Sequence, residues 1–383
     1  MIYILEETML SFKFSEILIQ RLNELHTEFA GIYATLSHYP EKLKAELHQY
    51  AKISMIGSST RIENAVLTDA EILWIDTILT KTGNKNTFPS KKLMIEDKLH
   101  KDKERSIEEV AGCRAMLELI YNQGNLFKPL TESIVRGLHS ELLQYYHRAG
   151  PYVGCYKKQP NFVVETDHKN KKQRIVFKTA EAGPITEAAM RDLIVWYNET
   201  QIQESRSIAV ACEFVYRFLA IHPFQDGNGR LGRGLFLLAL LQSNDIVIAD
   251  VIAYIAIDRH IERYKSEYYY VLHRCSNGKY QQNPTKYHID YFLEFMIKIL
   301  KGALADVGLY KKRFDAYLLL SESAKTVLTC FKGYPEVRLT KRAITEMTDL
   351  APRTVTYSLT TLVKNKFIQK QGQGAGVRYQ LIF

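Results

Sequence analysis

The chain has 383 residues, a length that allows two or three domains with large buried cores. It carries 51 Lys and Arg against 42 Asp and Glu, a net charge of +9, and 46% of its residues are hydrophobic, as in ordinary soluble globular proteins. The five cysteines are widely spread and include no Cys-x-x-Cys pair, which argues against both a disulfide framework and a zinc site.

Two further features concern the compartment. The first ten residues combine a short apolar run with Glu6 and Glu7, which is not the pattern of a secretory signal peptide. The longest apolar stretch, 236–257, is interrupted by Asn244 and Asp245, so it predicts buried helices and no membrane span. Together with the unpaired cysteines, these features predict a cytoplasmic protein in a reducing environment.

Helical patterns dominate the first third of the chain. Apolar residues at helical spacing predict one or two long helices over residues 15–55. The segment 59–64 then reads Ser-Thr-Arg-Ile-Glu-Asn, and its Thr60-x-x-Glu63 spacing is typical of the capping box that begins a helix. The helical pattern resumes at Ile107.

A short β-hairpin is expected to interrupt the helical pattern near residues 155–180. Two strand-like runs, 162–164 and 174–177, flank a polar turn at 167–170. Helices are expected on both sides of the hairpin, over 131–145 before it and over 184–197 and 205–220 after it. The last of these helices leads directly into the most informative stretch of the chain.

Residues 222–233 read His-Pro-Phe-Gln-Asp-Gly-Asn-Gly-Arg-Leu-Gly-Arg, and apolar segments flank them on both sides. This pattern predicts a polar loop between two buried elements. The Gly227-Asn228-Gly229 turn allows successive backbone N–H groups to face one anion. If residues 230–241 form a helix, its positive N-terminal end adds to that field. The loop is therefore suited to bind phosphate.

The side chains of this loop fit the same chemistry. Arg230 and Arg233 are three apart, so on a helix they share a face and can each bind phosphate oxygens. Asp226 is a hard oxygen ligand, suited to a Mg²⁺ ion that also contacts phosphates. His222 has an ordinary pKa near physiological pH, which suits it to accept a proton from an attacking hydroxyl. Phe224 is expected to point away from the loop and anchor it in the core.

The twelve residues match every defining position of the Fic family motif, His-x-Phe-x-Asp/Glu-Gly-Asn-Gly-Arg-x-x-Arg. In this motif the chain resembles enzymes that transfer a nucleoside monophosphate, most often AMP from ATP, onto a protein hydroxyl. The resemblance implies that ATP is the substrate and Mg²⁺ the metal. No covalent enzyme intermediate is implied, so catalysis would rest on positioning and on stabilisation of charge.

The resemblance also implies a role for each residue of the motif. His222 would be the general base on the target side chain. Asp226 would hold Mg²⁺ against the α- and β-phosphates of ATP. Gly227, Asn228 and Gly229 would bind the α/β-phosphate region. Arg230 and Arg233 would bind the outer phosphates, and Arg233 would lie nearest the γ-phosphate.

Beside this motif, segment 59–64 has a second interpretation. It matches the inhibitory pattern Ser/Thr-x-x-x-Glu-Gly/Asn that lies N-terminal to the motif in one class of the family. The resemblance implies that Glu63 reaches Arg233, occupies the place of the γ-phosphate and holds the resting enzyme off. Ser59, the first residue of the pattern, is a weaker candidate for the same site.

Two other segments resemble parts of the family's site. The hairpin is similar to the flap that pairs with an extended piece of the target and brings its hydroxyl to the base. This chain departs from the usual Arg-containing sequence before the flap, since residues 155–158 read Cys-Tyr-Lys-Lys, and residues 169–172 form a basic tip. Tyr269, in a run of three tyrosines, is a candidate for the adenine end of the pocket, with core packing as the alternative.

The end of the chain carries most of the excess positive charge. Residues 321–383 contain ten Lys and Arg against four Asp and Glu, which is +6 of the total of +9. Helices over 323–331, 340–350 and 352–364, followed by a hairpin, resemble a winged helix-turn-helix. Candidates for DNA contact lie at the start of the third helix: Arg353, Thr354, Thr356 and Tyr357. Dimerisation or protein docking through this domain is the alternative.

The sequence thus predicts a mainly α protein. Its expected parts are a helical region with the inhibitory pattern (1–105), a Fic-type helical bundle core with the flap (106–300), a helical connector (301–320) and a winged helix-turn-helix domain (321–383). The implied function is AMP transfer to a hydroxyl of a target protein or of the protein itself. A DNA-binding regulator whose Fic domain senses nucleotide, or a Fic enzyme that uses another nucleotide or removes AMP, are the alternatives. The expected partners are a target protein, DNA or a second copy, and no membrane.

Overall fold

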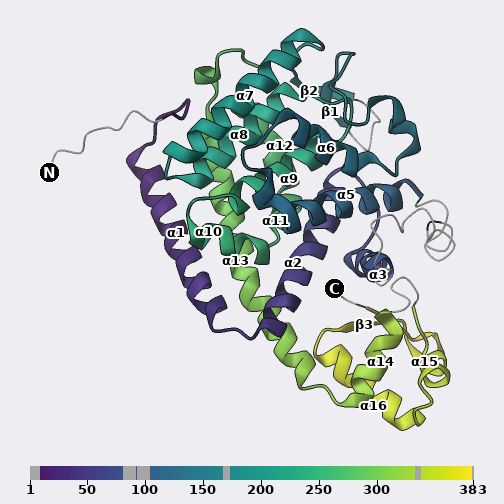
Figure 1. The fold of residues 1–383 in the computed structure, drawn as a ribbon. Helices are drawn as coiled ribbons and strands as arrows, with labels where there is room; N and C mark the ends of the chain where they lie inside the picture. Colours follow the sequence, from purple (N-terminus) through teal and green to yellow (C-terminus); the bar gives the residue numbers. More distant parts are fainter. Residues whose placement is uncertain (1–8, 81–91, 93–103, 167–172, 333–337, 382–383) are drawn as a thin grey trace.

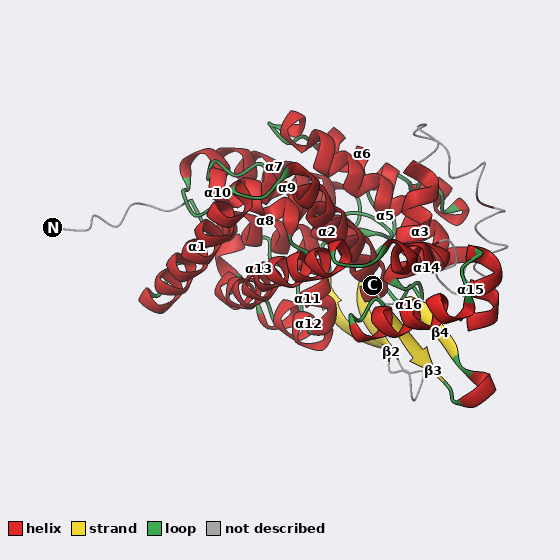
Figure 2. Cartoon of the chain, turned by 90° about the horizontal axis from the view of Figure 1, so that it is seen from below, coloured by secondary structure: helices red, strands yellow, loops and turns green. Residues whose placement is uncertain are grey.

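The computed structural model describes residues 9–80, 92, 104–166, 173–332 and 338–381 (Figure 1). The protein is built mainly of helices with two short antiparallel hairpins, as the sequence predicts, and Figure 2 shows the hairpins in yellow among the helices. In this part of the chain, no helix is long and apolar enough to cross a membrane.

The larger body consists of a bundle of helices. They are, in chain order, α1 (Glu16–Ser37), α2 (Glu41–Ile62), α3 (Asp69–Thr80), α5 (Glu104–Gln123), α6 (Glu132–Leu143), α7 (Pro184–Gln203), α8 (Ser207–Ile221), α9 (Asn228–Leu241), α10 (Ile246–Val251), α11 (Ile257–Arg263), α12 (Lys265–Arg274) and α13 (Ile289–Leu318). Short 3-10 turns lie between them at η2 (Gly124–Phe127), η3 (His147–Tyr152), η4 (Ile252–Tyr254) and η5 (Pro284–Lys286).

Helices α8 and α9 form the centre of this bundle. Both are buried over almost their whole length, as expected for helices that are apolar on every side. They pack against each other, with α5 against α9 and α7 and α13 against α8. The predicted motif begins in the loop between α8 and α9 and continues into the first turns of α9, which starts at Asn228, two residues before the predicted 230. The backbone of the loop is therefore anchored at both ends by buried helices.

The N-terminal helices share the same hydrophobic core. α1 packs along α10 and α13, while α2 packs on α5 and α11. α1 begins at Ser15, whose hydroxyl accepts a hydrogen bond from the Leu18 N–H, and Pro40 directly precedes α2. The two long helices predicted over 15–55 are therefore present, although α2 continues to Ile62.

This longer α2 excludes the capping-box interpretation of Thr60, one of the two interpretations of segment 59–64. Thr60 lies in the last turn of α2, and its hydroxyl donates back to the carbonyls of Ile56 and Gly57. Within α2, a Cβ at Gly57 would collide with the Asp69 carboxylate and the Arg61 guanidinium, so glycine allows α2 to pack closely on α3. The helix ends at Glu63, and Asn64 takes a left-handed conformation with φ of 75°.

The predicted hairpin is also present, between α6 and α7. Strand β1 (Phe162–Thr166) pairs antiparallel with β2 (Gln173–Lys178), with a register shift between Val163 and Val164. The predicted turn and basic tip, 167–172, lie outside the described residues. The base of the hairpin sits on the α8–α9 loop, since Tyr156 and Phe224 form an isolated β-bridge.

The last part of the chain forms a smaller unit with its own hydrophobic cluster (yellow in Figure 1). Its elements are α14 (Glu322–Lys332), α15 (Lys341–Thr348), α16 (Pro352–Lys364), β3 (Ile368–Gln371), η6 (Gly374–Gly376) and β4 (Arg378–Leu381). Their order is the one that the sequence predicts. Thr340 caps α15 through the Ala343 N–H, and Pro352 is the first residue of α16.

Helix α13 joins the two hydrophobic clusters. Its residues as far as Phe314 are buried in the larger core, whereas Tyr317 packs on the smaller one. The segment 301–320, predicted as a helical connector, is thus mostly the second half of a 30-residue helix that begins at Ile289. Apolar residues keep helical spacing across position 300, so α13 continues through the predicted boundary at 301 and does not begin there.

Candidate active site

A cavity of about 800 Å³ opens where α9 begins, and its walls come from the end of α2, the flap strands, α8 and α12. This volume is typical of pockets that hold small molecules. Most of the site residues predicted from the sequence line it: Glu63, His222, Asp226, Gly227, Asn228, Gly229, Arg230, Arg233 and Tyr269. Ser59 lies directly behind this wall, in contact with Arg233.

His222 is the residue that ends α8. Its φ of 54° is left-handed, a conformation that is uncommon for a residue with a Cβ and is often found at functional positions. The ring Nδ1 lies 3.2 Å from the carbonyl oxygen of Leu219, which can only accept, so Nδ1 carries the proton and Nε2 keeps a lone pair. Burial, helped by the Lys157 cation, lowers the pKa of His222 to about 4. The imidazole is therefore neutral and able to accept a proton near pH 7.

The loop after His222 is closed by side-chain contacts. The Asn228 side chain accepts from the N–H of Phe224 at 2.9 Å and donates to its carbonyl at 2.7 Å. Any contact of Asn228 with an anion would therefore be made by its backbone. Phe224 is fully buried, as predicted, and stacks on His139 with 3.9 Å between ring centroids. Gly227 begins α9 with φ of 80°, which favours glycine.

His139 is a support of this loop that sequence reasoning missed. Its Nδ1 accepts from the N–H of Gly154 at 2.9 Å, so its Nε2 carries the proton and donates to the Asp226 carbonyl at 3.0 Å. Burial lowers the pKa of His139 to about 4, which keeps this arrangement neutral. A single histidine on an amphipathic helix carries no signal of such a role in the sequence.

Asp226 presents one carboxylate to the cavity. Its Oδ1 accepts from the N–H of Gly227 at 2.6 Å and from Arg230 Nη2 at 3.3 Å. Mg²⁺ is commonly held by one or two carboxylates plus phosphates and water, so this side chain fits the implied metal. No cluster of three or more His, Cys, Asp or Glu that could hold a metal exists in the described part of the chain. A Mg²⁺ ion here would take its other ligands from the substrate and from water.

Arg230 is a buried cation, and part of its guanidinium is not hydrogen-bonded within the described residues. Its Nη1 lies 3.8 Å from the Glu109 carboxylate, and its Nη2 contacts Asp226. Within the described residues, its Nε and Nη1 have no hydrogen-bond partner. Buried polar groups are normally hydrogen-bonded, and a guanidinium with unpaired donors beside a cavity suits an anionic ligand.

Arg233 is held by two different segments. Its Nη2 donates to the Ser59 carbonyl at 2.8 Å and to Glu63 Oε1 at 3.1 Å, while its Nε donates to the Ser59 hydroxyl at 3.2 Å. The Asp258 carboxylate lies 3.3 Å from the same Nε. Asp258 was missed by sequence reasoning, because an Asp in the first turn of a helix is an ordinary helix-start residue. Burial raises the pKa of Asp258 to about 6.

The end of α2 is fixed by a second group of ion pairs. The Arg61 guanidinium donates to both carboxylate oxygens of Glu262, at 2.7 and 3.0 Å, and to Asp69 at 2.7 Å. Next to it, Lys265 donates to the side-chain oxygen of Asn64 at 3.2 Å. These contacts attach the residues on both sides of Glu63 to α3, α11 and α12.

The run of tyrosines on α12 divides between the core and the cavity. Tyr268 is buried against Phe292 and Phe295, and it also lines the cavity. Tyr269 is partly buried and lines the cavity, whereas Tyr270 is 61% exposed. Core packing and cavity lining are thus both present on one helix.

The four candidates for DNA contact lie in the smaller unit, apart from the cavity. Arg353, Thr356 and Tyr357 are exposed in the first two turns of α16, and Thr354 is half-buried. Tyr357 has 71% of its surface exposed, which is unusual for an aromatic residue.

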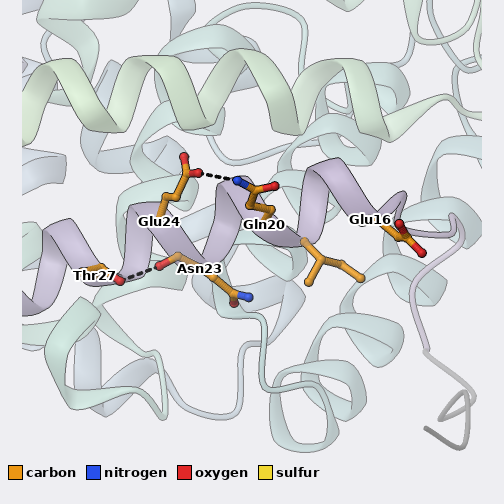
Figure 3. A pocket seen from close by; sticks show the side chains of 6 residues that line it. Glu16, Gln20, Asn23, Glu24 and Thr27 are labelled. Atoms are coloured by element: carbon orange, nitrogen blue, oxygen red, sulfur yellow. Dashed lines mark hydrogen bonds between the residues drawn. The ribbon is translucent and has the colours of Figure 1, made fainter.

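A second, shallower hollow runs along the outer side of α1. Figure 3 shows that its polar side chains project from this single helix, with a hydrogen bond of 3.0 Å between Gln20 and Glu24. Its lining residues are Glu16, Ile19, Gln20, Asn23, Glu24 and Thr27. This hollow offers no histidine and no cation, so it does not resemble the site at α9.

The fold and the cavity define a helical domain with a glycine-containing loop at the start of a buried helix. Residues 129–240 match the model of the Fic/DOC family. A Fido domain-containing protein from Dictyostelium discoideum is 41% identical over 66 residues, a match that spans 17% of this chain and 44% of that relative. The match thus covers less than half of the relative's length.

Solved structures share the fold. A Fic family protein from Desulfovibrio desulfuricans is 18% identical, with an alignment over 97% of this chain and 98% of that chain and a TM-score of 0.53. A Fic domain containing signaling protein from Bacteroides thetaiotaomicron is 22% identical, over 75% and 97% of the two chains, with a TM-score of 0.50. Together with the family match, these likenesses support a Fic domain in this chain.

Proposed function

We propose that this protein transfers AMP from ATP to a hydroxyl group of a protein, either a separate target or the protein itself. Fic family members are typically transferases that act on proteins with nucleotides. The observation that carries the proposal is the neutral His222, whose Nε2 keeps its lone pair, in the same cavity as a carboxylate, two glycines at the start of α9 and two buried arginines.

The reaction follows from this arrangement. The hydroxyl oxygen of the target attacks the α-phosphorus of ATP, and its proton passes to Nε2 of His222. A bond forms between that oxygen and phosphorus, the bond to the β-phosphate oxygen breaks, and pyrophosphate leaves. Backbone N–H groups at the start of α9 and the Arg230 guanidinium stabilise the charge on the phosphates. Mg²⁺ held by Asp226 would neutralise charge on the α- and β-phosphates.

We further propose that Glu63 inhibits the enzyme in its resting state. Its carboxylate contacts Arg233, the cation assigned to the outermost phosphate, and lies so close to Gly229 that a Cβ there would collide with it. A bound γ-phosphate and the Glu63 carboxylate are both negatively charged and would bind the same Arg233 guanidinium. Their repulsion means that only one of them can occupy this place at a time. Release of Glu63 would then be required for productive ATP binding.

Self-labelling with a tagged ATP tests this function. Glu63→Gly should label itself faster than the wild type, and His222→Ala in the Glu63→Gly background should not label. Mass spectrometry of the labelled protein reports the transferred mass and the modified residue. Absence of both label and nucleotide binding by Glu63→Gly with Mg²⁺ present would rule the proposal out. A transferred mass other than that of AMP would identify a different nucleotide, and loss of AMP from a labelled protein would identify the removal reaction.

A second candidate function, DNA binding, is favoured by α16. The start of this helix is exposed, carries Arg353 and Tyr357, and belongs to the segment that holds +6 of the net charge. If the smaller unit is a winged helix, these residues would meet base edges in the major groove. A gel-shift series with the full chain and mixed-sequence duplexes tests this. Binding should weaken with salt, survive His222→Ala and fall with Arg353→Ala; no binding at low salt would exclude the function.

A further inference from the structure

Lys157 is a buried lysine that the proposed chemistry does not use, and burial lowers its pKa to about 7. Only 2% of its surface is exposed. Its Nζ donates three hydrogen bonds of 2.9 Å, to the side-chain oxygen of Asn161, to the hydroxyl of Thr179 and to the carbonyl of Ile221. All three acceptors are neutral. Burying an ammonium group without a counter-charge is unfavourable, so the position is better explained by the three directional bonds than by packing.

The three acceptors belong to parts of the chain that meet at the active site. Asn161 directly precedes β1, Thr179 directly follows β2, and Ile221 is the last residue of α8. The Thr179 hydroxyl also contacts the Asn161 carbonyl at 2.8 Å. One ammonium group therefore joins both ends of the flap hairpin to each other and to the helix that ends at His222.

The same group of residues holds the backbone on both sides of the base. The Asn161 amide donates to the carbonyls of His222 at 3.3 Å and Phe224 at 2.7 Å. The backbone N–H of Lys157 donates to the carbonyl of Pro223 at 2.7 Å. A residue in the left-handed region keeps that conformation only when its surroundings hold it there, and these bonds supply such support for His222.

We propose that Lys157 is a positioning residue that sets the flap in register with His222, and so determines where a target hydroxyl meets the base. This inference rests on the proposed transfer reaction. Lys157 is not among the residues that line the cavity. Its group of residues holds the loop at 221–224, whereas the part expected to meet phosphates, from Asp226 onward, is held by His139 and by the start of α9. Loss of its three bonds should therefore affect the transfer step more than nucleotide binding.

Kinetics in the Glu63→Gly background test this positioning role. Lys157→Met keeps the length of the side chain and removes its donors, so the self-labelling rate at saturating ATP should fall about tenfold or more. The KM for ATP should stay within about twofold. Lys157→Arg retains charge and donors and should restore most of the rate. The matched control is Lys158→Met, since the neighbouring Lys158 is exposed and should leave both values unchanged.

A spectroscopic measurement tests the same placement without any transfer reaction. The Lys157 cation lowers the pKa of His222, so NMR titration of the His222 ring should move upward in pH in Lys157→Met and stay in place in Lys158→Met. Equal titration and equal rates in these two variants would overturn the inference. So would parallel losses of rate, ATP affinity and thermal stability in Lys157→Met. If Glu63→Gly itself does not label, the proposed function fails, and the His222 titration still decides whether Lys157 acts on the base.

Discussion

Asp258 lies 3.3 Å from the Nε of Arg233 and is almost fully buried, with 1% of its side chain exposed. Glu63 contacts the same guanidinium at Nη2, but 32% of its side chain is exposed. The two carboxylates therefore differ in how readily a ligand can replace them. Asp258 is enclosed and stays beside Arg233 as a buried counter-charge, whereas Glu63 borders the cavity and can give way to a phosphate.

Removing both carboxylates should destabilise the protein by more than the sum of the single changes. Either carboxylate alone still compensates the buried Arg233 charge, and an uncompensated buried charge costs about 3 kcal/mol or more. Urea unfolding of Asp258→Asn, Glu63→Gly and the double variant measures this coupling. Asp250→Asn, at an exposed position, is the control and should be neutral. Simple additivity would show that Asp258 does not share Arg233 with Glu63.

Loosening the end of α2 should activate the enzyme without touching Glu63. Arg61→Met removes the bonds to Glu262 and Asp69, so Glu63 should leave Arg233 more often. Self-labelling should rise about fivefold or more over the wild type and stay below that of Glu63→Gly. Arg21→Met breaks an exposed ion pair on α1 and should have no effect. A labelling rate equal to that of the wild type would show that Arg61 does not help to restrain Glu63.

The transfer rate should not show the acid limb of an ordinary histidine. The pKa of His222 is about 4 because burial and the Lys157 cation disfavour its charged form, while Glu63 and Asp226 act in the opposite direction. In Glu63→Gly one of these opposing anions is gone, so the pKa should fall further and the base stays neutral above pH 5. The rate at saturating Mg-ATP, recorded from pH 5 to 8, should not fall as the pH drops through 6.5. Because burial lowers the pKa of Lys157 to about 7, a fall of the rate as the pH rises would report that ammonium group and not the base. A loss of rate toward acid, centred near pH 6.5 and absent from nucleotide binding, would contradict the assignment.

The unfolding free energy should report the same depressed pKa values. Because the pKa of His139 and His222 is about 4 in the folded protein and near 6.5 when unfolded, the unfolded chain binds more protons between these values. Their contribution to stability is therefore complete above pH 6.5 and is lost as the pH falls toward 4. Asp258, with its raised pKa, contributes in the opposite sense. The free energy of unfolding, measured by urea at several pH values, should therefore fall less steeply with acid in His139→Gln than in the wild type. An equal slope in the two proteins would contradict the low pKa of His139.

Metal removal should stop the chemistry. In the Glu63→Gly background, EDTA should abolish self-labelling, and Asp226→Asn should lower the rate about 100-fold or more because a metal ion supplies several kcal/mol of charge stabilisation. Raising the Mg²⁺ concentration should rescue the EDTA-treated protein fully and the variant only in part. Asp250→Asn again serves as the control. Full labelling by Asp226→Asn at low Mg²⁺ would remove Asp226 from the metal site.

The local parts of the site were predictable because each depends on neighbours along the chain. The helix of the motif and the buried Phe224 follow from residues within a dozen positions, and the structure contains both. The predicted Gly227-Asn228-Gly229 turn is shorter than expected, because α9 begins at Asn228 and only Gly227 lies before it in a left-handed conformation. The capping-box interpretation of Thr60 rested on equally local evidence and does not hold. Thr60 lies in the last turn of α2, which packs on α3 and α11, and Arg61 binds Asp69 and Glu262 on those helices.

The sequence by itself determined the kind of chemistry this protein can host, because base, carboxylate, glycines and arginines lie within twelve consecutive residues. Only the tertiary structure decided what surrounds that loop. Glu63 meets Arg233 across 170 positions, and Lys157 meets the helix end before His222 across 64, through the packing of α2 and the flap on α8 and α9. Such long-range contacts are set by how whole helices and strands pack together, so no local spacing of residues could reveal them.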